Sequence, residues 1–353
     1  MTVDLSSLGW DETFASSYAR FACAHHRPAR VARVDRGICT LLDPDGASRA
    51  SIGGGLLAAA AKDPARLPCA GDWVVVREWP DHCATIETVL PRRTAIVRAT
   101  AGAAATAQVL AANVDTAAVV ASVDPEPDLG RIERLLALAW ESGAQPLVIV
   151  TKVDLAAHPD ALVEEIREVA RQVEVVAVSA VSGAGLDRLR PLVCAGRTLG
   201  LLGVSGSGKS TLVNALAGAA VMVTQTIRRA DGRGRHTTTF RALVPLPSGG
   251  SVLDTPGIRA VGLFDGVTGL SQAFSDIAEL SEQCQFPDCR HEREPRCAVR
   301  EALAVGELTP RRLESWHKLR RELEAELHRQ QARQSAIERV ARKRPARRPS
   351  GSF

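Results

Sequence analysis

The stretch GVSGSGKS occupies residues 203–210. It fits the pattern G-x-x-x-x-G-K-[ST], in which a glycine-rich loop between a strand and a helix wraps the phosphates of a nucleotide. The context agrees, because the apolar run TLGLLG leads into the loop and STLVNALAG, which has helical character, follows it. We expect backbone N–H groups of residues 205–210 to bind phosphate, Lys209 to hold the β- and γ-phosphates and Ser210 to bind magnesium. A glycine- and serine-rich turn without a ligand is the alternative, which the flanking strand and helix disfavour.

Two segments upstream predict that the nucleotide carries guanine. TKVD (151–154) follows the apolar strand PLVIV, and Asp154 would accept hydrogen bonds from N1–H and the 2-amino group of guanine. Adenine lacks this pair, so the carboxylate discriminates between the two bases. Lys152 would line the base or the phosphate loop, and Ser179 and Ala180, after the next strand, would place a backbone N–H near the guanine O6.

A third segment, DTPG (254–257), follows another predicted strand downstream of the phosphate loop. Asp254 would hold magnesium through water, and the amide of Gly257 would sense the γ-phosphate. The next residue is Ile258, at the place where a Ras-like enzyme has its water-orienting glutamine. Isoleucine cannot orient water, so we expect slow unaided hydrolysis, with another group completing the site.

The segment between these two motifs, TIRRADGRGRHTTT (226–239), takes the place of a first switch region. A threonine of this region should meet magnesium when GTP is bound. We expect Thr238 to do so, with Thr237 as the alternative. His236 is a candidate for positioning the attacking water or the switch. A solvent-facing histidine in a loop is the other interpretation of this residue.

The order of these motifs is rotated relative to an ordinary guanine-nucleotide domain, in which a motif like TKVD follows the phosphate loop. The order predicts a circularly permuted domain, which is tolerated where the original termini lie close together. The predicted catalytic residues are Lys209, His236 and Thr238, and the magnesium ligands are Ser210, Thr238 and Asp254. The predicted nucleotide-binding residues are Thr151, Lys152, Asp154, Ser179, Ala180, Gly203, Val204, Ser205, Gly206, Ser207, Gly208, Lys209, Ser210, Thr211, Asp254 and Gly257.

A cysteine-rich segment near the C-terminus has the spacing C-x4-C-x-H-x5-C, formed by Cys284, Cys289, His291 and Cys297. Three thiolates and one imidazole suit tetrahedral zinc, and four protein ligands leave no open position. We therefore predict one structural zinc ion rather than a catalytic one. A chance cluster of free cysteines is the alternative.

The 353 residues, 45% of them hydrophobic, predict a multidomain globular chain. Short β-rich pieces predict a barrel over 29–100, which the pattern alone leaves open between an OB-fold and an SH3-like barrel. Alternating strands and helices over 101–266 predict a mostly parallel sheet covered by helices. The zinc-binding helical region spans 267–335. The ends are an N-terminal extension, 1–28, and a basic disordered tail, 336–353, which could touch RNA or be merely solvated.

The charge and the N-terminus narrow the class of protein. The net charge of +4 is too mild to predict nucleic-acid binding by itself. The start MTVDLSSLGWDE lacks a signal-peptide pattern, and no apolar run approaches the length of a membrane span. We therefore expect a cytoplasmic protein without a membrane partner, working as a monomer, whose cysteines are not in disulfides.

The combination of barrel, permuted guanine-nucleotide domain and Cys3His module resembles the small-ribosomal-subunit-dependent GTPase A family (RsgA, also called YjeQ). The resemblance covers roughly residues 29–325 and rests on AANVD (111–115), TKVDL, GVSGSGKSTLVNAL, GRHTTT, DTPGI and the zinc spacing. It implies an OB-fold barrel, GTP or GDP with Mg²⁺, and binding to the rRNA and proteins of the small (30S) ribosomal subunit late in its maturation. It also implies hydrolysis stimulated by that subunit, with His236 implicated in catalysis. Thr151 departs from the family, many members of which have asparagine there.

Two other functions remain open at this point. One is an RNA-binding assembly factor whose nucleotide site only stabilises the fold; Ile258 keeps this possibility open for the isolated protein. The other is an ATPase or kinase, against which Asp154 argues. The presence of Lys209, Ser210, Thr238 and Asp254 favours turnover of GTP.

Overall fold

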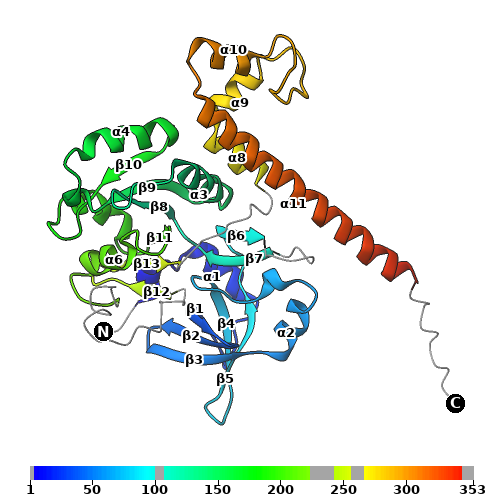
Figure 1. Ribbon diagram of the computed structural model, residues 1–353. Coiled ribbons are helices and arrows are strands. Elements are labelled where there is room, and N and C mark those ends of the chain that lie inside the picture. Colours follow the sequence, from blue (N-terminus) through cyan, green and yellow to red (C-terminus); the bar gives the residue numbers. More distant parts are fainter. Residues whose placement is uncertain (1–3, 100–106, 223–241, 256–265, 344–353) are drawn as a thin grey trace, which may run out of the picture.

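The computed structural model describes residues 4–99, 107–222, 242–255 and 266–343 (Figure 1). Within them lie a β-barrel, a mostly parallel sheet covered by helices, and a helical C-terminal region. Among the described helices, none combines the length and apolar character needed to cross a bilayer.

The barrel is closed and has five strands. They are β1 (His26–Asp35), β2 (Ile38–Asp43), β3 (Gly46–Ile52), β4 (Trp73–Glu78) and β5 (Ala84–Val89). The order is β1-β2-β3-β5-β4, and β4 pairs back with β1 to close the barrel. β3 and β5 run parallel, and α2 (Gly54–Ala60) and η2 (Pro64–Arg66) connect β3 to β4. This arrangement is that of an OB-fold, so the OB-fold prediction is confirmed.

The central sheet has the order β10-β9-β8-β11-β13-β12, in which only β12 among these strands is antiparallel to its neighbour. β8 and β11 are buried along their whole length, as is typical of parallel strands covered on both faces. The strands are β8 (Thr116–Ser122), β9 (Gln145–Thr151), β10 (Glu174–Ala177), β11 (Thr198–Leu202), β12 (Ala242–Pro245) and β13 (Ser251–Asp254). A separate hairpin, β6 (Ala95–Ala99) and β7 (Ala107–Ala112), connects the barrel to this sheet.

The helices that cover the central sheet are amphipathic, and α3 (Leu129–Glu141) also begins at a capping residue. In α3 the apolar residues Ile132, Leu135 and Leu136 are buried, and the side chain of Asp128 caps the first turn by accepting from the amide of Arg131. Gly143, at φ 78°, lies just beyond its end. The others are α4 (Pro159–Val169), α5 (Leu186–Leu189) and α6 (Lys209–Ala217), with short 3-10 turns η3 (Val153–Leu155) and η4 (Arg190–Val193).

The C-terminal region consists of α8 (Val267–Ala273), α9 (Ser275–Ser281), α10 (Ala298–Val305) and α11 (Pro310–Lys343). The long helix α11 starts beside α3 and α8 and then extends away from the body of the molecule (Figure 1). It continues to Lys343, so the first eight residues of the predicted disordered tail, 336–343, are helical. The rest of that tail, residues 344–353, lies outside the described residues.

The N-terminal extension is ordered from residue 4 and packs on the barrel. It contains η1 (Ser6–Leu8) and α1 (Glu12–Ala19), and the side chains of Leu8 and Phe14 are buried. The ring of Trp10 meets Trp73 of β4 edge-on, with centroids 4.8 Å apart. Aromatic packing therefore joins this segment to the barrel.

A buried arginine joins the extension, the barrel and the sheet. Arg30 of β1 is 1% exposed, and burial lowers its pKa to about 10, so it stays charged at neutral pH. Its guanidinium donates to three backbone carbonyls, those of Leu8, Gly71 and Asn113, the last at 2.9 Å. These carbonyls belong to the extension, to the turn before β4 and to the residue just after β7, so one side chain fixes three parts of the chain together.

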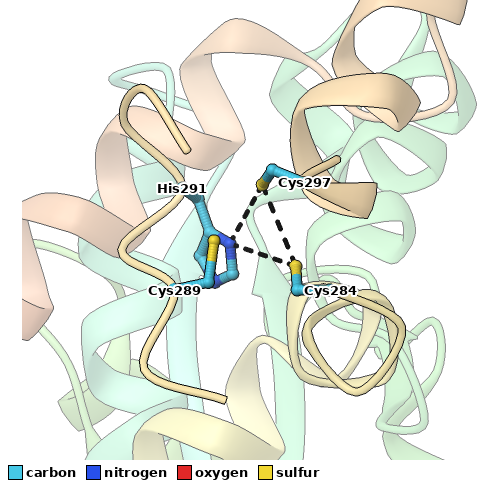
Figure 2. Close-up of side chains that lie close together, drawn as sticks. All are labelled: Cys284, Cys289, His291 and Cys297. Carbon is cyan, nitrogen blue, oxygen red and sulfur yellow. Dashed lines mark hydrogen bonds between the residues drawn. The ribbon is translucent and has the colours of Figure 1, made fainter. Parts of the chain in front are cut away.

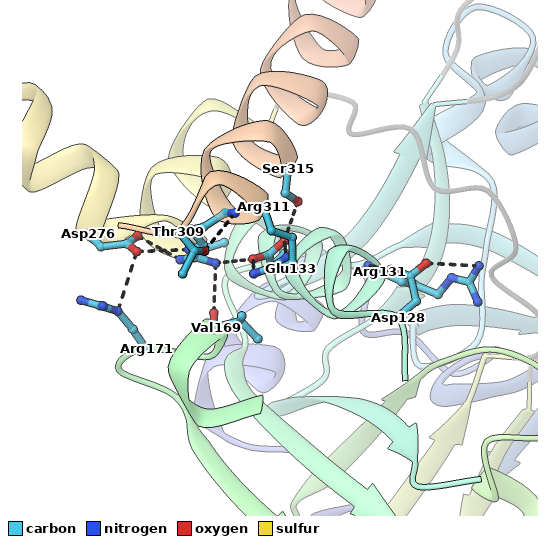
Figure 3. A network of polar contacts seen from close by, with 11 residues as sticks. Asp128, Arg131, Glu133, Val169, Arg171, Asp276, Thr309, Arg311 and Ser315 are labelled. Atoms are coloured by element: carbon cyan, nitrogen blue, oxygen red, sulfur yellow. Dashed lines mark hydrogen bonds and ion pairs between the residues drawn. The ribbon is translucent and has the colours of Figure 1, made fainter. Parts of the chain in front are cut away.

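A largely buried cluster of charged and polar groups holds α11 against α3 and α9 (Figure 3). We call it the Glu133 cluster; its members are Glu133, Asp276, Arg311, Arg312 and Ser315. The side chain of Glu133 is fully buried in α3, and that of Arg312 is 4% exposed. Arg312 lies 2.7 Å from a Glu133 oxygen and 2.9 Å from an Asp276 oxygen, so its charge is compensated on both sides.

Replacing Arg312 by alanine should destabilise the protein by about 3–5 kcal/mol, because it leaves the Glu133 and Asp276 carboxylates buried without their main partner. The matched control is Arg167→Ala on α4, which removes an exposed ion pair with Glu164 and should cost no more than about 1 kcal/mol. Urea denaturation of both variants measures the difference. Equal midpoints for the two variants would show that the cluster does not hold α11 in place.

Candidate functional site

The predicted phosphate loop connects β11 to α6, as the pattern requires. Gly206 and Gly208 have φ values of 89° and 87°, a left-handed backbone that favours glycine. At Gly203 a Cβ atom would lie 2.6 Å from the Val120 carbonyl oxygen, so only glycine fits there. The loop runs directly into the N-terminus of α6, whose first amides have no partners within the helix and are available to an anion.

Two buried charges lie at this loop. Lys209 is 6% exposed, and its ammonium donates to the carbonyls of Gly203 and Val204 at 2.8 and 2.7 Å. Asp254, the last residue of β13, is 2% exposed. Burial lowers the pKa of Lys209 and raises that of Asp254, and each charge partly offsets the shift of the other. The two groups are therefore close enough to interact electrostatically.

Two polar atoms at the loop lack partners. Asp254 Oδ1 and Ser207 Oγ are buried and form no hydrogen bond within the described part of the chain. Unsatisfied buried oxygens are costly, and at a ligand site they are the groups that a bound species satisfies. A carboxylate oxygen next to a phosphate-binding loop fits a hydrated magnesium ion, which prefers oxygen ligands. Ser210, in the first turn of α6, is half-buried beside this position, and Thr211 is exposed.

The TKVD loop is tied to the phosphate loop by Thr151. Its hydroxyl is 2.7 Å from the Ser207 carbonyl, with the Ala121 carbonyl at 3.2 Å. Lys152 has a left-handed backbone, φ 59°, and its ammonium donates to the Asp124 carbonyl at 2.6 Å. The side chain of Asp154 is exposed and open to a ligand. Threonine at this position thus joins the two loops through its hydroxyl.

The segment with Ser179 and Ala180 lies beside the TKVD loop. β10 pairs in parallel with β9, and the amide of Val153 approaches the Val178 carbonyl at 3.4 Å. Ser179 is 1% exposed, and its hydroxyl accepts from the amide of Ser182 at 3.1 Å, which shapes the turn. The carboxyl ends of parallel strands meet at one edge of a sheet, which is where such folds bind ligands. The structure accordingly brings the phosphate loop, Asp254, TKVD and Ser179 to one edge.

The structure does not describe the remaining predicted residues of this site. His236, Thr237 and Thr238 belong to residues 223–241, and Gly257 and Ile258 belong to residues 256–265; both stretches lie outside the described residues.

The four predicted zinc ligands come together between α9 and α10 (Figure 2). Their sulfur and nitrogen atoms all lie within 4.8 Å of one another. His291 Nδ1 is 3.3 Å from Cys297 Sγ, and the sulfurs of Cys284 and Cys297 are 3.9 Å apart. Burial raises the pKa of the Cys289 thiol to about 12, so binding of a cation is what would deprotonate it. The donor set suits a soft divalent metal.

All eight cysteines lie in the described residues, and none of them is paired in a disulfide there. The other five cysteines, Cys23, Cys39, Cys69, Cys83 and Cys194, take no part in the Cys3His group.

Known proteins of one family resemble this chain. The family model for the RsgA GTPase matches residues 89–264. The small ribosomal subunit biogenesis GTPase RsgA of Streptomyces coelicolor is 52% identical over 321 residues, covering 90% of this chain and 86% of the relative. That of Methanosarcina acetivorans is 40% identical over 316 residues, covering 89% and 84%.

Solved structures agree with these sequence comparisons. YjeQ from Thermotoga maritima superimposes with a TM-score of 0.62 at 26% identity, covering 84% of this chain and 98% of YjeQ. YloQ, described as a circularly permuted GTPase, has the same fold, with a TM-score of 0.57 over 86% of this chain and 96% of YloQ. The chain therefore belongs to the RsgA GTPase family, which confirms the resemblance, the permuted fold and the GTP hydrolase class expected from its sequence.

Proposed function

We propose that this protein binds the small ribosomal subunit late in its maturation and hydrolyses GTP there, with the nucleotide state controlling binding and release. The observation that carries the proposal is the meeting of Lys209, Asp254 and the TKVD loop at one edge of a permuted sheet. Relatives at 40–52% identity are named small ribosomal subunit biogenesis GTPases, which supports the partner. A protein with this task works in the cytoplasm, and we propose that it acts as a monomer.

In the proposed chemistry the chain's residues orient GTP and offset charge. The amides of residues 205–210 bind the phosphates, and Lys209 turns from its two carbonyls to the β- and γ-phosphates. Magnesium, held by Ser210, Thr238 and, through water, Asp254, would neutralise charge on the phosphate oxygens. Gly257 would sense the γ-phosphate, and His236 would position the attacking water.

Recognition of guanine falls to the neighbouring loops. Asp154 accepts from N1–H and the 2-amino group, while Lys152 lines the base and the segment of Ser179 and Ala180 supplies an amide near O6. Thr151 holds these residues in place through the Ser207 carbonyl. Because adenine cannot supply this pair of donors to the carboxylate, the arrangement favours GTP and GDP over ATP.

Position 258 is isoleucine rather than glutamine, which supports stimulation of hydrolysis by the small ribosomal subunit. Without a glutamine that orients water, hydrolysis by the protein alone is slow. Binding to the small subunit would complete the site, for example by fixing His236. GTP would then be hydrolysed rapidly only after the protein has bound the subunit.

The permuted order of the motifs could couple the nucleotide state to the barrel and to the C-terminal helical region. The DTPG segment is followed in the chain by α8, and α8 packs closely on α3, where a Cβ at Gly269 would lie 2.2 Å from the Ala137 carbonyl. We propose that contacts of the γ-phosphate at Gly257 change how the barrel, 29–100, and the helical region, 267–335, grip the subunit around the GTPase domain, 101–266.

Co-sedimentation with purified small subunits tests this coupling. The protein should bind more tightly with a non-hydrolysable GTP analogue than with GDP. Equal affinity in the two states would favour an RNA-binding assembly factor in which the nucleotide only stabilises the fold.

The Cys3His group is proposed to hold one structural zinc ion through Cys284, Cys289, His291 and Cys297. The purified protein should contain one zinc per chain by elemental analysis, and Cys289→Ser should lower that content, because the group loses one of its four ligands. Cys83→Ser, which alters an exposed thiol of the barrel, is the control and should keep the metal. Equal zinc content in the two variants would contradict the assignment.

A further inference from the structure

The two ring nitrogens of His291 face different partners. Nδ1 points toward the sulfurs, at 3.3 Å from Cys297 and 3.7 Å from Cys284. Nε2 lies 3.0 Å from the hydroxyl oxygen of Ser281, the last residue of α9. A neutral imidazole carries one proton, so the group beside Nε2 decides which nitrogen has a free lone pair.

The direction of the Ser281 contact follows from its second hydrogen bond. The Ser281 hydroxyl is also 2.6 Å from the backbone carbonyl of Ile277, one turn earlier in α9. A carbonyl can only accept, so the single hydroxyl hydrogen goes to Ile277. The Ser281 oxygen is then left to accept from N–H at Nε2 of His291. The proton resides on Nε2, and the lone pair of Nδ1 faces the three cysteines.

Packing holds the ring in this orientation. His291 is 4% exposed, and the indole of Trp316 from α11 lies against its ring, with centroids 5.2 Å apart and planes tilted by 51°. Ser281 thus fixes the edge of the ring and Trp316 covers its face. A ring flipped about its Cβ–Cγ bond would put Cδ2 where Nδ1 lies and Cε1 where Nε2 lies, and so would lose both the contact with the sulfurs and the hydrogen bond to Ser281.

We propose that Ser281 is a positioning residue of the metal centre, which selects Nδ1 of His291 as the ligand atom; this rests on the proposed zinc site. A partner that fixes the tautomer and orientation of a ligating histidine typically contributes about 10–100-fold to metal affinity. No feature of the cysteine spacing indicates this residue, because Ser281 precedes the first cysteine and belongs to a helix.

The test compares three full-length variants. Ser281→Ala removes the acceptor and should weaken Zn²⁺ binding by about 10–100-fold in competition with a chromophoric chelator. Ser281→Thr keeps the hydroxyl and should restore most of the affinity. Ser271→Ala is the matched control, because Ser271 of α8 makes the same bond to the carbonyl one turn earlier, that of Val267, but contacts no metal ligand. Binding of fluorescent GDP by all three checks that they are folded.

A second measurement examines the wild-type protein directly. In the zinc-loaded chain, long-range ¹H–¹⁵N NMR spectra should show His291 ligated through Nδ1 with a proton on Nε2. Ligation through Nε2, or a zinc affinity of Ser281→Ala equal to that of Ser271→Ala, would overturn the assignment of Ser281. A wild-type protein that binds no zinc would instead overturn the metal centre itself, leaving the GTPase site untouched.

Discussion

Replacing Lys209 by alanine is expected to lower the turnover of GTP by at least about 100-fold, the effect of removing one well-placed charge-stabilising group. The ammonium lies at the phosphate loop, bound to the carbonyls of Gly203 and Val204, and is ready to turn to the β- and γ-phosphates. Charge that develops on the transferred group would then lack its main protein cation.

The experiment measures steady-state release of phosphate in the presence of small subunits. Lys62→Ala, which alters an exposed lysine near the barrel, serves as the control and should keep full activity. The Lys209 variant should still bind small subunits but fail to leave them. Unchanged turnover in this variant would remove the phosphate loop from the mechanism.

Replacing Asp154 by asparagine is expected to weaken binding of GDP by about 100-fold or more, since the base loses an acceptor of two hydrogen bonds. The amide offers one acceptor and one donor instead of two acceptors. This pattern suits xanthine, which carries a carbonyl where guanine has its 2-amino group. Xanthosine diphosphate should therefore bind the variant better than GDP does, reversing the preference of the original protein.

Displacement of a fluorescent nucleotide measures both affinities. Asp160→Asn, an exposed carboxylate at the start of α4, is the matched control and should keep the preference for GDP. If ADP displaced GDP from the original protein at similar concentrations, the assignment of guanine would be wrong and an ATPase or kinase would become the better account.

The parts of the molecule that the sequence predicts well are those set by local pattern. GVSGSGKS specifies its own loop because Gly203, Gly206 and Gly208 meet backbone conditions that only glycine satisfies easily. The Cys3His group is also set by local sequence, since its four residues lie close together in the chain, with Cys289 and His291 on the segment between α9 and α10. The rotated order of the motifs then predicts the topology of the sheet.

The features that the sequence does not predict depend on contacts between segments that are far apart in the chain. Glu133, on an amphipathic helix, has the sequence pattern of a solvent-facing residue, yet its side chain is fully buried. Its charge is compensated by Arg312, which lies 179 residues away in the chain, so no local pattern could predict the pair. Arg30 likewise gives no local signal, since its role depends on carbonyls of three separate segments. The order of the N-terminal extension comes from Leu8 and Phe14 packing on the barrel, a contact that the local pattern of residues 1–28 does not reveal.

The central claim is that a permuted GTPase acts on the small ribosomal subunit, and turnover of GTP with and without purified small subunits tests it most directly. Large subunits and ATP serve as controls. We predict slow hydrolysis by the protein alone and a strong increase only with small subunits and GTP, because the partner completes a site that lacks a water-orienting glutamine. Tight binding of GTP with no stimulation by small subunits would contradict this account.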